Sequence, residues 1–142
     1  MKKGVFRLLF AAMMLTTFAL TGCIKEQYFG SDVKAYYVTA RANSWQLYGE
    51  PGVQGCYIYQ TFDFPEITER VVADGFVTAF FCGKNGETQL PYIIPYDEGY
   101  GLTENIYCDY TRGSLTFIIE ASDFSAAPRI ADIKFKVVVV TP

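Results

Sequence analysis

The chain of 142 residues contains no histidine. Histidine is the commonest general base and a frequent zinc ligand, so its absence excludes the usual Ser-His-Asp and Cys-His catalytic arrangements and most zinc sites. The serines have no base to activate them and none lies in a nucleophile-elbow motif. We therefore expect no catalytic residue, no metal site and no cofactor. A hydrolase that works through paired carboxylates is the remaining enzymatic alternative.

Basic residues are also outnumbered: the chain contains twelve Lys and Arg and fifteen Asp and Glu. Three of the basic residues, Lys2, Lys3 and Arg7, belong to the N-terminal segment, whereas all the acids follow residue 23. Without that segment the net charge is −6. An acidic domain lacks the basic surface that phosphates require, so nucleic acid is excluded as a partner.

The N-terminus has the order of a secretory signal, with a basic segment at 1–7 and an uncharged apolar run at 8–20. As a helix this run would cover only about 20 Å, which is too short to span a bilayer. It ends in Leu20-Thr21-Gly22-Cys23, which resembles the lipobox of bacterial lipoproteins. The resemblance implies cleavage before Cys23, attachment of lipid to its thiol and anchoring in a membrane.

The residues after Cys23 suggest a destination and the domain boundaries. No Asp follows Cys23, and Lys25-Glu26 is similar to the charged export signal of Bacteroidota lipoproteins. We expect anchoring at the outer membrane, on either its periplasmic or its surface-exposed face. The predicted organisation is a signal peptide at 1–22, a lipidated tether at 23–32 and one folded domain at 33–142.

The three cysteines that remain after Cys23 are an odd number, so at most one disulfide can form among them. Cys56, Cys82 and Cys108 each stand singly in an apolar stretch. We interpret them as small buried hydrophobic residues. A bridge between Cys82 and Cys108 is the alternative.

Aromatic and β-branched residues are abundant and favour strands. Strands are expected at 33–40, 45–48, 56–64, 76–82, 88–94, 105–110, 114–120 and 130–141, the last of them central and covered on both faces in its second half. Hairpins are predicted at 84–87 and 111–113, and Pro91 places its strand at an edge or bulge. One or two helical turns are expected at 68–75, with Thr68 as N-cap and Gly75 as the C′ residue.

These elements predict an all-β fold: an antiparallel β-sandwich of about seven strands with Ig-like or related Greek-key topology, after an N-terminal signal helix. The chain also resembles a group of small β-sandwich lipoproteins from Bacteroidota. The matching positions are Trp45, Ile67-Thr68, Gly75-Phe76-Val77, Leu90-Pro91-Tyr92 and Phe135-Lys136-Val137-Val138-Val139. The resemblance implies a sandwich and says nothing of an activity.

Four aromatic residues are the candidate ligand-binding positions: Trp45, Tyr48, Tyr96 and Tyr100. Flat rings in open loops can stack on a sugar or hold a peptide without needing a charge. A core position is the alternative for Trp45. The sequence thus predicts a non-enzymatic binding or adhesion module for a glycan or a protein. A structural accessory subunit of an outer-membrane or cell-surface assembly is the second hypothesis.

Overall fold

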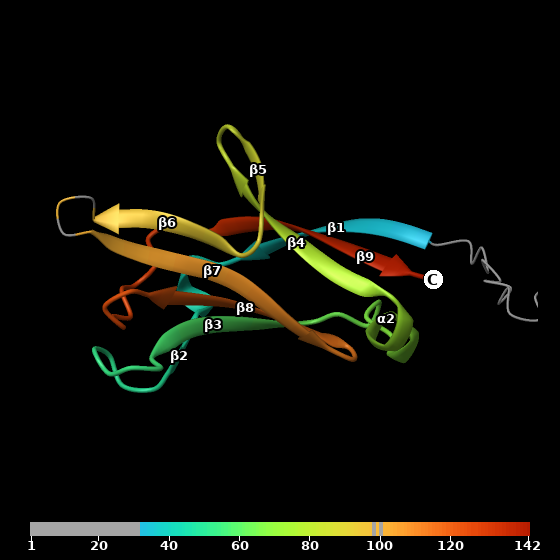
Figure 1. The fold of residues 1–142 in the computed structure, drawn as a ribbon, viewed down its shortest axis with the longest axis horizontal. Coiled ribbons are helices and arrows are strands. Elements are labelled where there is room, and N and C mark those ends of the chain that lie inside the picture. Colours follow the sequence, from blue (N-terminus) through green and yellow to red (C-terminus); the bar gives the residue numbers. More distant parts are fainter. Residues whose placement is uncertain (1–31, 98, 100) are drawn as a thin grey trace, which may run out of the picture.

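Two antiparallel sheets packed face to face make up the fold in the computed structural model, which describes residues 32–97, 99 and 101–142 (Figure 1). The predicted signal peptide, Cys23 and the tether up to residue 31 lie outside the described residues. The sandwich prediction is confirmed. The described residues form nine strands rather than about seven.

The four-stranded sheet has the order β1-β9-β4-β5, with β1 at Asp32–Ala40, β9 at Ile133–Thr141, β4 at Phe76–Gly83 and β5 at Gly86–Gln89. The five-stranded sheet has the order β2-β3-β8-β7-β6, with β2 at Gln46–Tyr48, β3 at Tyr57–Asp63, β8 at Ser114–Ala121, β7 at Leu102–Thr111 and β6 at Tyr92–Asp97. Strand β3 lies beside β8, the last strand of the β6-β7-β8 meander, although the β4-β5 hairpin separates them in sequence. This is a Greek-key arrangement.

Strand β9 is central, as expected, because it lies between β1 and β4. Its inward residues Phe135, Val137 and Val139 are buried. Val138 and Val140 point to the other face and remain partly accessible, so the expectation of cover on both faces is only partly met. No second layer lies over that outer face among the described residues.

The core between the sheets is centred on two stacked rings. Phe117 of β8 and Phe135 of β9 are both fully buried, with ring centroids 3.9 Å apart and an interplanar angle of 10°. Phe62 meets Phe117 edge-on at 5.9 Å, and Phe81 meets Phe135 edge-on at 6.3 Å. Each sheet thus contributes two rings to one inter-sheet cluster.

The short helix α2 (Glu69–Asp74) confirms the predicted helical turns. The Thr68 hydroxyl accepts a hydrogen bond from the Val71 N–H at 3.3 Å, as expected of an N-cap. Gly75 does not have the left-handed conformation predicted for it, because its backbone is extended at φ −105°. Close packing explains why a glycine is needed at this position: a Cβ on residue 75 would lie 2.1 Å from the Val140 carbonyl oxygen.

The predicted hairpins form, with one correction. Thr111 pairs with Ser114 around Arg112-Gly113, and Gly83 pairs with Gly86 around Lys84-Asn85. The strand expected at 88–94 is instead two edge strands in different sheets, β5 and β6. The chain changes sheets at Leu90-Pro91, where Pro91 has no N–H to continue a ladder and the buried Leu90 N–H donates to the Ala79 carbonyl at 2.9 Å.

All three cysteines are free thiols, so the alternative bridge between Cys82 and Cys108 is not formed. The interpretation of the cysteines as buried residues is wrong for Cys82, which is only partly buried: alternation along β4 puts it on the outer face of its sheet, opposite the inward Phe81. Cys108 lies in β7 on the inner face of the other sheet, paired with Phe117. Cys56 is buried, as predicted.

Burial raises the pKa of the Cys108 thiol from its ordinary value of 9.0 to about 11, and the Asp109 carboxylate adds to this shift. We expect iodoacetamide to alkylate Cys108 at pH 8 at least about tenfold more slowly in the folded protein than in urea, measured by peptide mass spectrometry. Because the unfolded chain loses this proton at lower pH, stability should fall as pH rises from about 9 to 11. Cys108→Val should remove the part of this loss of stability that comes from the thiol. Equal alkylation rates in the folded and the unfolded protein would contradict the first prediction.

Candidate functional site

Tyrosines from three strands gather on the outer face of the five-stranded sheet. Tyr48 of β2 is opposite Tyr57 of β3, and their rings are stacked with centroids 4.6 Å apart and an interplanar angle of 15°. Tyr59 lies on the same face of β3 and meets Tyr57 at 6.1 Å. Tyr107 of β7 completes this set. We refer to Tyr48, Tyr57, Tyr59 and Tyr107 as the tyrosine platform.

Ile118 of β8 shows that the platform is continuous across the sheet. It lies between Tyr59 and Tyr107 in the register, on the outward face, yet only 6% of its surface is exposed. An outward isoleucine in a sheet without a second layer can be buried only by its neighbours on the same face. The rings on both sides therefore cover it, whereas Tyr48 at the sheet edge stays 56% exposed.

Acidic and amide groups lie among the rings. Burial, followed by the neighbouring tyrosines and by Asp109 and Glu120, raises the pKa of Tyr57. Burial first, then Glu120, Asp109 and Tyr57, also raises the pKa of Tyr107. Both phenols therefore remain neutral hydrogen-bond donors at physiological pH, beside two carboxylates that accept.

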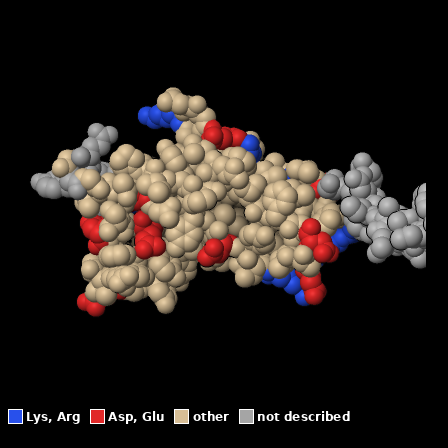
Figure 2. Space-filling model, in the orientation of Figure 1, with Lys and Arg blue, Asp and Glu red and all other residues tan. Residues whose placement is uncertain are grey.

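Asn105 adds an unsatisfied acceptor to this face. It pairs with Glu120 in the register, and its Oδ1 is buried without a hydrogen-bond partner among the described residues. The described strand residues on this face include no lysine or arginine. In the view of Figure 2, basic side chains lie at the periphery, over the β4-β5 hairpin and near α2, while acidic side chains are spread across the width of the molecule.

The structure brings together only part of the predicted aromatic site. Tyr48 belongs to the platform, whereas Trp45 is partly buried and packs against the core. Tyr96 lies in β6, and its side chain is outside what the structure describes; Tyr100 is also outside the described residues. Sequence reasoning missed Tyr57, Tyr59 and Tyr107, although Tyr57 and Tyr59 alternate on one face of their strand.

Among the described residues, no helix combines the length and the apolar character that a membrane span requires. In the same residues, no cluster of three Asp, Glu or Cys side chains could hold a metal ion.

Comparisons with models of protein families, with curated proteins and with solved structures found no match to the chain. The class of the protein is therefore defined by the fold itself. The chain is a small two-sheet antiparallel β-sandwich domain. It presents an acidic, tyrosine-rich outer face on its five-stranded sheet.

Proposed function

We propose that the protein is a non-enzymatic binding or adhesion module, anchored to the outer membrane through lipidated Cys23, and that its tyrosine platform receives a neutral glycan. The observation that carries the proposal is the stacked Tyr48–Tyr57 pair with the Glu120 carboxylate near it. Aromatic faces can pack on the C–H faces of a sugar ring, while carboxylate oxygens accept hydrogen bonds from its hydroxyls.

The charge of the platform limits the kind of glycan. Asp109 and Glu120 lie close enough to Tyr57 and Tyr107 to disfavour a negative charge on either phenol. The same carboxylates would repel uronic acids, sialic acids and sulfated sugars. A neutral hexose or N-acetylhexosamine polymer meets no such repulsion.

A Tyr57→Ala variant tests the proposal directly. We expect its affinity for neutral glycans to fall about tenfold, which corresponds to about 1.4 kcal/mol, because the substitution removes the central ring of the platform. The measurement is a glycan array followed by calorimetry, on protein lacking residues 1–23. Tyr37→Ala is the matched control, because Tyr37 is 61% exposed on the outer face of the other sheet.

Two results would contradict the proposal. One is that no neutral glycan on the array binds the protein. A pull-down would then test for a protein partner instead. The other is an equal loss of affinity in Tyr57→Ala and Tyr37→Ala.

A second proposed function is that of a structural accessory subunit of an outer-membrane or cell-surface assembly. It is favoured by the uncovered outer face of the four-stranded sheet, where Val33, Tyr37 and Phe76 are exposed. Exposed apolar surface of this kind is typical of protein interfaces. Native mass measurement after mild detergent extraction distinguishes the two functions, because an obligate subunit keeps a fixed partner.

A further inference from the structure

The outer face of the four-stranded sheet carries no charged side chain at the end where β1 begins. Two adjacent rows of residues, paired across β1, β9 and β4, make up this end of the face. We refer to them as the end patch: Val33, Val140 and Phe76 in the first row, and Ala35, Val138 and Thr78 in the second. Val33 is 62% exposed and Phe76 is 51% exposed, so apolar surface is open to solvent here.

Charged side chains occupy the other half of the same face. Lys136 lies in the next row, between Tyr37 and Phe80, and Lys134 lies one row further along β9. The Lys134 ammonium is 4.5 Å from the centroid of the Tyr37 ring, and the Lys136 ammonium is 4.6 Å from that of Phe80. Lys136 also pairs with Glu87 of β5. The face therefore divides into an apolar end and a charged end.

The apolar end is also the end at which the chain enters the domain. Figure 1 shows the start of β1, the C-terminus after β9 and helix α2 together at this end of the sandwich. Asp32 follows Cys23, the predicted site of lipid attachment, by nine positions. Even fully extended, this connection spans only about 30 Å. The end patch is therefore the part of the face that the tether holds nearest to the bilayer.

We propose that the end patch contacts the zwitterionic lipid surface in which Cys23 is anchored, so that the tyrosine platform on the opposite sheet faces away from the membrane. The inference rests on the lipid anchor of the first proposed function. Exposed apolar patches mark membrane or protein contact sites. The tether favours the membrane, because a short linker gives a roughly millimolar effective concentration, at which even a weak contact orients the domain.

Charge determines the kind of lipid surface. The end patch contains no lysine or arginine, and Lys34 beside it in β1 is paired with Asp32 at 3.0 Å. Asp74 lies just before Phe76 in the sequence. Anionic headgroups attract basic clusters, whereas a domain with a net charge of −6 is repelled by them. Phosphatidylcholine and phosphatidylethanolamine present a surface without this repulsion.

Quenching of tryptophan fluorescence by brominated phosphatidylcholine tests the orientation on the full-length, lipidated protein in vesicles of these two lipids. In a Trp45→Phe background, which removes the only native tryptophan, Phe76→Trp should be quenched at least about threefold more than Ile93→Trp. Ile93 is the matched position, because it is 62% exposed on the outer face of the opposite sheet. Equal quenching would show that neither face prefers the bilayer and would overturn the proposal.

Val33→Asn tests the patch itself. Added to the Phe76→Trp reporter, it places a polar side chain in the first row and should reduce the quenching at least about twofold. Val53→Asn is the matched control and should leave the quenching unchanged, because Val53 is 50% exposed in the loop before β3. Equal effects of the two substitutions would exclude a specific contact through the end patch.

A measurement on the unaltered protein covers the case in which a variant fails to fold. Spin-labelled phosphatidylcholine in nanodiscs broadens the methyl signals of residues close to the lipid. The signals of Val33 and Val140 should broaden more than those of Ile93 and Ile130, although Ile93 is as exposed as Val33 and Ile130 is fully exposed. Stronger broadening of Ile93 or Ile130 would reverse the orientation and refute the proposal.

The failure of this inference can be told apart from the failure of the proposed function. Protein that floats with the vesicles but shows equal quenching of the two reporters keeps its anchor and loses only the orientation. Protein that does not float has no anchor, and both proposals then fail. Equal quenching together with a fixed partner that Val33→Asn releases in native mass measurement would assign the end patch to a protein interface instead.

Discussion

Replacing Phe135 with alanine is expected to lower the free energy of unfolding by about 3–5 kcal/mol. The Phe135 ring is fully buried, stacks on Phe117 of the opposite sheet at 3.9 Å and meets Phe81 edge-on. Its removal leaves a void where the two sheets touch, and the central strand β9 cannot move inward without disturbing its pairing with β1 and β4. Domains of this size are stable by only about 5–15 kcal/mol, so the loss is a large fraction of the total.

Urea titration followed by tryptophan fluorescence measures this effect, because Trp45 is the only tryptophan and packs against the core. Phe76→Ala is the matched control in the same sheet, since Phe76 is exposed on the outer face, and should change stability by less than about 1 kcal/mol. Phe135→Leu should lose much less than Phe135→Ala. Equal losses for Phe135→Ala and Phe76→Ala would show that the stacked pair does not hold the sheets together.

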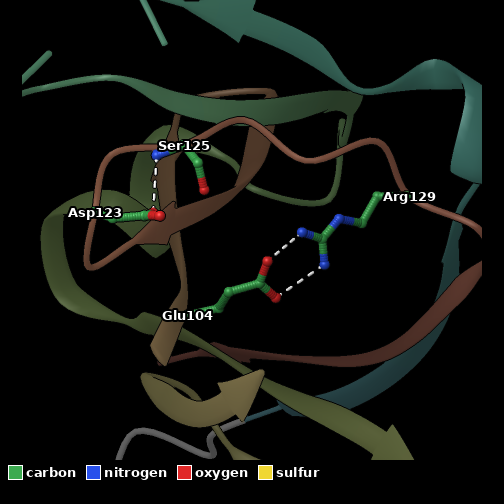
Figure 3. A network of polar contacts seen from close by, with 4 residues as sticks. All are labelled: Glu104, Asp123, Ser125 and Arg129. Carbon is green, nitrogen blue, oxygen red and sulfur yellow. Dashed lines mark hydrogen bonds and ion pairs between the residues drawn. The ribbon is translucent and has the colours of Figure 1, made fainter. Parts of the chain in front are cut away.

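Arg129→Met is expected to destabilise the domain by about 3–5 kcal/mol, because it leaves the Glu104 carboxylate buried without the counter-ion that Arg129 supplies (Figure 3). The double variant Glu104→Leu with Arg129→Met should recover most of this loss. Replacing a buried ion pair with apolar residues of similar size is often neutral or stabilising, since both desolvation penalties disappear.

The same urea titration compares these variants with Arg112→Met. Arg112 and Glu69 form an ion pair at 3.6 Å, but both side chains are largely exposed. Exposed pairs of this kind contribute about 0–1 kcal/mol, so Arg112→Met should have little effect. If the double variant is as unstable as Arg129→Met, the unpaired carboxylate is not the cause of the loss. The ion pair would then stabilise the domain by fixing the segment between β8 and β9 to β7.

Local features of the fold could be predicted because a few neighbouring residues determine them. Thr68 caps α2 through an N–H three residues later, and Gly113 supplies the positive φ of 75° in the β7-β8 turn. The division of 88–94 between two sheets could not be predicted in the same way. Pro91 indicated an interruption, but which sheet each half joins depends on Phe80 and Ile106, partners distant in sequence.

The tyrosine platform shows the same limit in the site. Alternation along β3 separates Tyr57 and Tyr59 from Ile58, but both sets are apolar enough to line a core. Only the packing of the second sheet against Ile58 decides that the tyrosines point outward. Tyr48 could be proposed as a binding residue because it lies near a turn. Tyr107 lies within a strand, and no local sequence feature marks it as a binding residue.

Composition and short-range patterns are enough to predict the β class, the hairpin turns, the acidic charge of the domain and the absence of histidine chemistry. Tertiary packing brings together groups that are distant in the sequence: Phe117 with Phe135, Glu104 with Arg129, and Tyr57 with Tyr48. The physical reason is that strand order and register are set by burial over the whole sandwich. A strand's two faces become core and surface only when the opposite sheet covers one of them.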